Sequence, residues 1–243
     1  NFGAWIPTVE VPRTGFADAT LDVADRVANG SPATIGDPMA AVHEADAGRP
    51  VIWVAHTTRY RGGSAAFGVA ADTMVRELAA AQPDADVQLA RLDGKADFVA
   101  EMDRLAAEGR EIRELHFIGH SGMYGPMFKS TEWPEQFSPH EWREMQIPFA
   151  EDGRAFFHAC RTARWFAPFF ARTFDVPCSG NHGYTTVSAR KDRFAWAGRT
   201  PEDRESLYLV ATPGKKSHGI AGSLKKYTGA PVEPMTEYLP RDP

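Results

Sequence analysis

Two stretches of the chain, Leu-His-Phe-Ile-Gly-His-Ser-Gly at 115–122 and Phe-Phe-His-Ala-Cys-Arg-Thr-Ala at 156–163, decide the fold. Each stretch is an apolar run that ends in a reactive residue, His120 in the first and Cys160 in the second. The working residues of parallel α/β sheets lie beyond the carboxyl ends of the strands. If the two runs are neighbouring parallel strands, His120 and Cys160 leave the sheet at the same edge. The pattern therefore predicts a His/Cys nucleophilic pair.

Strand and helix patterns alternate along the chain on the amino-terminal side of these two runs. Apolar residues at helical spacing predict one helix over 65–81 and a second helix that ends at Gly109. The first four predicted strands cover 49–55, 85–92, 112–118 and 154–159. Strand–helix–strand order predicts βαβ units with helices on both faces of the sheet. The expected fold class is α/β, a three-layer α/β/α sandwich around a mostly parallel central sheet.

The connection at 123–152 is rich in Trp, Pro, Phe and Glu. Within it, Ser138-Pro139 has the residue types of a helix N-cap and first helical position, which predicts a short helix over 138–145. Aromatic residues at helical spacing then predict a helix over 165–174, with Pro168 in its first turn.

The remaining segments complete the expected organisation. Fifth and sixth strands are predicted over 183–189 and 206–212. Residues 1–48 are irregular apart from a helix near 18–28, and the carboxyl-terminal residues are polar and Pro-rich. We therefore expect an amino-terminal arm at 1–48 that packs on the domain, a catalytic domain at 49–226 and an extended tail at 227–243.

Composition excludes several classes of function. The chain has 243 residues with 43% hydrophobic and 24% charged residues, which is ordinary for a globular α/β domain. The net charge of −5 and the lack of a basic patch argue against nucleic acid as a partner. No apolar run approaches the roughly 18 residues of a membrane helix, so no membrane partner is expected. Two cysteines make no disulfide scaffold, which favours a reducing compartment. The cytoplasm is the expected location, and secretion after removal of a leader stays open.

The predicted pair has the chemistry of a nucleophilic site. A cysteine thiol with a pKa of about 8.5 is only slightly ionised at neutral pH, so it needs a base such as histidine nearby. Adjacent strands lie roughly 4.8 Å apart, which brings both strand ends within reach of one substrate carbonyl. The backbone N–H groups of Ser121, Gly122 and Cys160 are candidate oxyanion donors.

The order apolar strand, His, small residue, Gly, apolar strand, Ala-Cys resembles the caspase-like superfamily of cysteine peptidases. The caspase signature is Q-A-C-[RQG]-G, with a histidine about 50 residues upstream. Here it reads His158-Ala159-Cys160-Arg161-Thr162, so the chain is similar to the divergent bacterial members. The resemblance covers roughly 49–213 and implies a peptide or protein substrate, His120 as base and Cys160 as nucleophile. Members are frequently zymogens, and 123–152 is the natural candidate for a lid or an activation site.

The resemblance also implies residues for substrate binding. In caspases, the pocket for the residue before the cut uses an Arg after the first strand, the residue two before the cysteine, and a Ser-x-Arg run. In this chain those positions are Arg59 or Arg61, His158, and Ser188 with Arg190. They imply a basic pocket that prefers Asp or Glu. Metacaspases and gingipains use acidic pockets instead, for which Asp93 and Asp192 are available, so the specificity stays open.

Three alternatives remain. Ser121 fits a serine-hydrolase elbow, G-x-S-x-G, except that Met123 replaces the last Gly; Asp175 or Asp192 and then His218 would complete that triad. A metal site would draw on His116, His120, His158, Cys160, Cys178 and His182. No H-E-x-x-H or paired C-x-x-C motif is present, so neither metal nor cofactor is expected. The third alternative is a non-catalytic binding domain of the same fold. The oligomeric state stays open.

Overall fold

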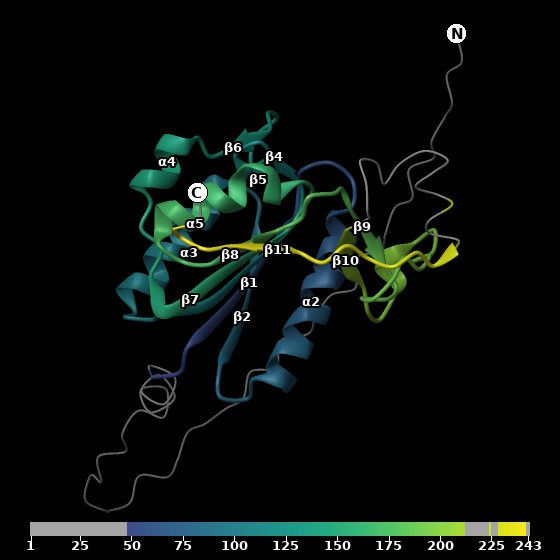
Figure 1. The fold of residues 1–243 in the computed structure, drawn as a ribbon, viewed down its shortest axis with the longest axis horizontal. Coiled ribbons are helices and arrows are strands. Elements are labelled where there is room, and N and C mark those ends of the chain that lie inside the picture. The colour runs from purple at the N-terminus through teal and green to yellow at the C-terminus, as the bar shows by residue number, and fades with distance from the viewer. Residues whose placement is uncertain (1–47, 212–223, 225–227, 242–243) are drawn as a thin grey trace, which may run out of the picture. The chain divides into compact units, whose positions relative to one another are not determined.

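The computed structural model describes residues 48–211, Leu224 and 228–241. All of the predicted amino-terminal arm except Gly48 lies outside these residues, as do the helix near 18–28 and His218. A six-stranded, mostly parallel sheet forms the centre, with strand order β11-β8-β7-β3-β1-β2 (Figure 1). These strands are β1 (Val51–Thr57), β2 (Asp86–Leu92), β3 (Ile112–Ile118), β7 (Phe149–His158), β8 (Cys178–Gly180) and β11 (Thr236–Tyr238). Only β11 runs antiparallel to its neighbour.

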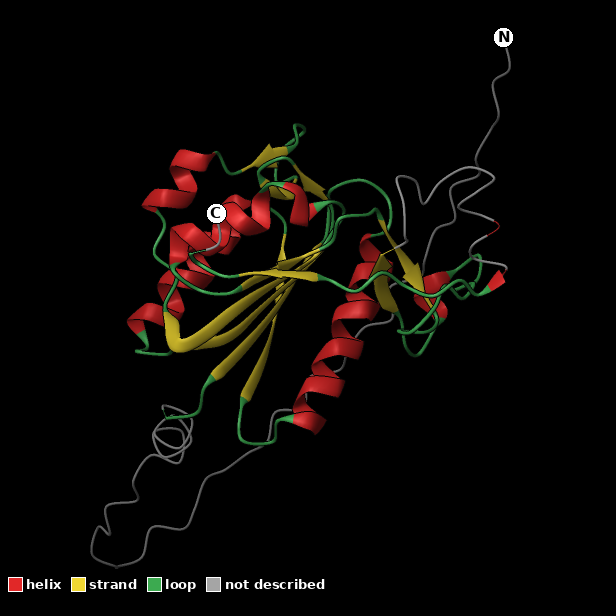
Figure 2. Ribbon diagram, viewed as in Figure 1, coloured by secondary structure: helices red, strands yellow, loops and turns green. Residues whose placement is uncertain are grey.

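Helices cover both faces of this sheet (Figure 2). On one face, α2 (Ser64–Ala81) packs Phe67 and Ala71 against alternate residues of β1. On the other face lie α3 (Lys95–Ala107), α4 (Pro139–Glu144) and α5 (Phe166–Phe174), which share a larger core with Trp53 and Phe117. All seven residues of β1 are buried, as expected of a central parallel strand with both faces covered. The structure therefore has the α/β architecture expected from the sequence.

The edge of the sheet differs from the expectation. Strands form where the fifth and sixth were predicted, as β9 (Thr185–Ser188) and β10 (Tyr208–Ala211). They pair with each other, antiparallel, in a separate two-stranded sheet. Val187 and Leu209 pack this hairpin against the core on the α2 side. The central sheet instead continues through β8 and β11, the second of which lies in the predicted carboxyl-terminal tail.

The long connection after β3 is a small structured unit. It begins as a three-stranded antiparallel sheet of β4 (Ser121–Gly122), β5 (Gly125–Phe128) and β6 (Glu135–Gln136). The predicted short helix follows as α4. Ser138 Oγ accepts a hydrogen bond from Glu141 N at 3.2 Å, and the Glu141 carboxylate accepts one from Ser138 N at 2.7 Å. This capping box confirms the expected start of the helix.

Trp142 of α4 joins this connection to the core. Its side chain is fully buried and its indole Nε1 donates to the carbonyl of Tyr124 at 2.9 Å. Five aromatic rings, all with centroids within 6.2 Å of the indole, surround it: Phe98, Phe137, Phe166, Phe170 and Phe174. The indole therefore ties the segment that follows His120 to the core beneath the sheet.

Replacing Trp142 by Ala should lower the free energy of unfolding by about 3–5 kcal/mol, because it opens a large cavity and leaves the Tyr124 carbonyl without its donor. Urea denaturation followed by circular dichroism measures the change. Trp133→Ala is the matched control: Trp133 is 77% exposed, so its removal should cost less than about 0.5 kcal/mol. Equal effects of the two substitutions would contradict this account of the core.

Candidate active site

The register of β3 and β7 brings the two reactive residues together. The strands pair in parallel, and Ile118 lies opposite His158. His120 and Cys160 each follow this pair by two residues, so they leave the sheet at the same level of the same edge. Both line one cavity of about 480 Å³. Its other walls come from the turn after β1, from α2 and from the β9–β10 hairpin, and they include Tyr60, Gly62, Phe67, Thr185, Val187 and Leu209.

His120 is held as a neutral base. Its ring lies edge-on between Tyr60 and Phe67, with centroid distances of 5.5 and 5.1 Å. Nε2 lies 3.1 Å from the carbonyl oxygen of Gly62. Because a carbonyl can only accept, Nε2 carries the hydrogen and Nδ1 keeps the lone pair. Burial lowers the pKa of His120 below 6.5, and the positive charge of Arg61 lowers it further, against the Gly62 hydrogen bond, which raises it.

Cys160 is held through its sulfur and through its backbone. Sγ accepts from the Thr185 N–H at 3.3 Å and lies 3.3 Å from Thr185 Oγ1. The Ser121 hydroxyl donates to the carbonyl of Cys160. The Oγ1 contact can run in either direction, and the thiol also donates to the carbonyl of Thr185 at 3.9 Å, so three atoms of one residue position the sulfur. Thr185 lies within the predicted fifth strand, and no motif in the sequence marks it as a site residue.

The turn after Cys160 is shaped by close packing. Thr162 Oγ1 donates to the carbonyl of Phe157 at 3.1 Å and accepts from Asn181 N at 3.0 Å. A Cβ on Gly180 would approach Thr162 Oγ1 and the backbone of Ala163 at 2.8 Å, so the approach of β8 to this turn requires glycine. Thr162, which differs from the caspase pattern, thus links the turn after Cys160 to the neighbouring strand.

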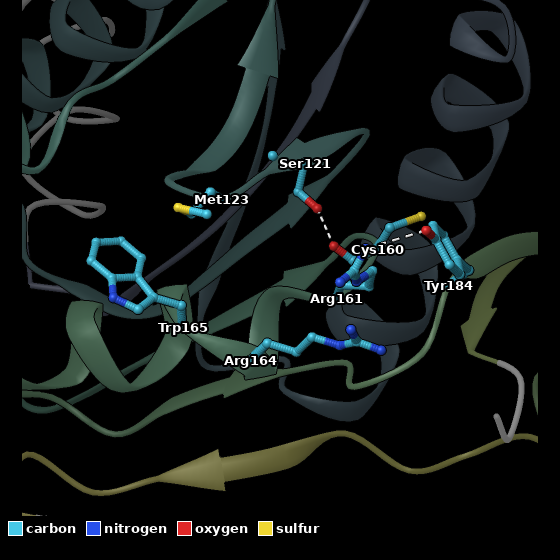
Figure 3. A pocket seen from close by; sticks show the side chains of 8 residues that line it. Ser121, Met123, Cys160, Arg161, Arg164, Trp165 and Tyr184 are labelled. Atoms are coloured by element: carbon cyan, nitrogen blue, oxygen red, sulfur yellow. Dashed lines mark hydrogen bonds between the residues drawn. The ribbon is translucent and has the colours of Figure 1, made fainter. Parts of the chain in front are cut away.

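The predicted oxyanion residues lie beside Cys160. Ser121, Gly122 and Cys160 all line a second cavity, of about 370 Å³ (Figure 3). Within the described part of the chain, the Cys160 backbone N–H makes no hydrogen bond and remains a donor for a substrate oxygen. The space above Gly122 is filled by the Gln136 side chain, which a Cβ there would meet at 2.7 Å. Gly122 therefore serves the packing of Gln136 rather than a close approach of substrate on that side.

Four residues expected to bind substrate lie outside the two cavities that Cys160 lines. Arg59 pairs with Asp93 at 3.5 Å, and Arg190 pairs with Asp192 at 3.0 Å. Ser188 is buried and its hydroxyl donates to the Arg193 carbonyl at 2.8 Å. Neither these residues nor His158 line the two cavities around Cys160. Of the two arginines that follow the first strand, Arg61 lines the cavity with His120 and Arg59 does not.

His158 belongs to a stacked polar cluster on the sheet. Its Nε2 lies 3.1 Å from Nδ1 of His116, whose Nε2 lies 3.0 Å from the Glu114 carboxylate. The His116 ring stacks on Phe156 with a centroid distance of 4.6 Å. Burial, with the nearby charge of His116, lowers the pKa of His158 to about 3. His158 is therefore neutral at physiological pH and binds its histidine neighbour.

The geometry gives less support to a metal site or to a serine-hydrolase triad. Among the described residues, no three His, Cys, Asp or Glu side chains gather to hold a metal ion. Both cysteines are free, and Cys178 is buried in β8. The acids of the serine-hydrolase alternative lie apart: Asp175 caps the end of α5, and Asp192 binds Arg190 and Arg193. No helix of the described chain has the length and apolar character needed to cross a bilayer.

Comparisons with known proteins found no matching family model, no matching curated protein and no matching solved structure. The assignment of function therefore rests on the geometry of the site.

Replacing Thr185 by Val should slow alkylation of Cys160 by iodoacetamide at pH 7 about tenfold, because the hydroxyl that lies 3.3 Å from the sulfur and helps to position it is lost. Mass spectrometry of the Cys160 peptide gives the rate. Thr186→Val is the matched control, since Thr186 lines the same cavity without bonding the sulfur. Equal alkylation rates in the two variants would show that the Thr185 hydroxyl does not influence the Cys160 sulfur.

The folded protein should lose stability as the pH falls from 7 to 5. Free histidine has a pKa of about 6.5 and His158 one of about 3 in the fold, so in this window the unfolded chain binds a proton that the folded chain does not. His158→Gln should flatten the dependence measured by urea unfolding at each pH. His140→Gln, at an exposed position, should leave it unchanged.

Proposed function

We propose that the chain is a cysteine endopeptidase of the caspase-like type, with Cys160 as nucleophile and His120 as general base. One observation carries the proposal: His120 follows β3 and Cys160 follows β7 at the same level, and both side chains line one cavity. A neutral, oriented imidazole that shares a cavity with a positioned thiol supports thiol catalysis.

The geometry supports a two-step hydrolysis. His120 Nδ1 takes the thiol proton, and the thiolate of Cys160 attacks the substrate carbonyl to give a tetrahedral intermediate. The Cys160 N–H donates to the developing oxyanion. The C–N bond then breaks, and the imidazolium gives its proton to the leaving amine. A water molecule, deprotonated by His120, attacks the thioester in the second step and releases the acid and the free thiol.

The serine-hydrolase alternative has weaker support. The Ser121 hydroxyl already donates to the Cys160 carbonyl, so it stabilises the nucleophile turn. Asp192 forms ion pairs with two arginines. A non-catalytic binding domain would require neither the Gly62 carbonyl on His120 nor the Thr185 N–H on the sulfur.

Cys160→Ala should abolish both peptide cleavage and thiol labelling without unfolding the chain. Cys178→Ala is the control. Burial raises the pKa of the Cys178 thiol well above its usual value, so this cysteine should neither react nor contribute to cleavage. Cleavage is measured on a mixed peptide library and labelling with iodoacetamide. Activity that survives Cys160→Ala but is lost in Ser121→Ala would establish the serine hydrolase instead.

A further inference from the structure

The second cavity beside the nucleophile contains two arginines. It is lined by Ser121, Gly122, Met123, Cys160, Arg161, Arg164, Trp165 and Tyr184 (Figure 3). It shares Ser121, Cys160 and Tyr184 with the cavity that contains His120. A peptide held at Cys160 would therefore extend from one cavity into the other. We call the second cavity the arginine cavity.

Both arginines are oriented by neutral groups. Arg161 Nη1 donates to the Tyr184 hydroxyl at 3.3 Å, and its guanidinium lies 5.5 Å from the centre of that ring. Arg164 Nε donates to the carbonyl of His182 at 3.1 Å. Both arginines are exposed, and these contacts use one N–H group of each guanidinium and leave the other donors available.

The charges of these two arginines are not balanced by the protein. Neither forms an ion pair within the part of the chain that the structure describes, whereas Arg59 and Arg190 each pair with an aspartate. Arg161 also adopts a left-handed backbone conformation, with φ of 59°, which is uncommon for a residue with a side chain. Such conformations persist where the surrounding structure fixes them, often at functional sites.

We infer that the arginine cavity binds an acidic side chain of the substrate, Asp or Glu, within about two residues of the scissile bond. This inference rests on the proposed function and adds its substrate class. Guanidinium groups bind carboxylates through paired hydrogen bonds. Trp165 and Met123 are 38% and 67% exposed and supply apolar walls for the stem of that side chain. Cys160 itself lines the cavity, so the carboxylate lies close to the bond that is cut.

A labelling experiment tests the site without requiring peptidase activity. Iodoacetate carries a carboxylate and iodoacetamide does not, so the ratio of their rates at Cys160 reports anion binding beside the sulfur. Arg161→Gln/Arg164→Gln should lower this ratio at least fivefold, and 0.5 M NaCl should lower it in the wild type. Arg172→Gln, an exposed arginine of α5 outside the cavity, is the matched control and should leave the ratio unchanged. An unchanged ratio in the double variant overturns the inference.

A cleavage experiment then connects the site to the substrate. Peptide pairs that differ only by Glu or Gln at each position around the scissile bond should show at least tenfold higher kcat/KM for one Glu position. The double variant should lose this preference, mainly through KM, and still cleave the Gln peptide. If the preference persists there but is lost in Arg59→Gln/Arg190→Gln, the acidic residue binds elsewhere and the inference fails. If no peptide is cleaved but the labelling ratio responds, the peptidase proposal fails and the anion site stands.

Discussion

The parallel pairing of β3 with β7 is the constraint on which the rest of the site depends. Its register sets Ile118 opposite His158 and so carries the two reactive residues out of the sheet at one level. A parallel ladder fixes this level through evenly spaced backbone hydrogen bonds along both strands. A slip of one residue would reverse the faces of Phe157 and Cys160, moving the first out of the core and the second away from Thr185. Core packing therefore fixes the geometry of the candidate site.

The strand pattern could be read from the sequence because buried parallel strands are apolar on both faces. The exit of His120 and Cys160 at one edge followed from topology alone. The edge of the sheet could not be read in the same way. β8 has only three residues, too few for a periodic signal, and the alternation of β9 does not specify its partner. That partner is selected by distant packing of Val187 and Leu209 on the α2 side.

Side-chain directions in the turns were the least predictable part of the site. The side chain of an arginine after a strand can point into a pocket or into solvent. The conformation of the turn decides which direction it takes. Arg59 turns to Asp93, whereas Arg61 lines the cavity. The contribution of Thr185 also depends on tertiary structure, because β9 must lie against the turn after Cys160 before the Thr185 N–H can reach the sulfur.

The two turns that frame the site share one feature. Arg61 and Arg161 both have a left-handed backbone, at φ of 58° and 59°, although each carries a Cβ that disfavours it by roughly 1–2 kcal/mol. Arg61 precedes Gly62, whose carbonyl holds the His120 ring, and Arg161 directly follows Cys160. The left-handed conformation therefore occurs at the two sharp turns that position His120 and Cys160. The same two turns place a guanidinium in each cavity, so the backbone that positions His120 and Cys160 also sets the charge of the two cavities.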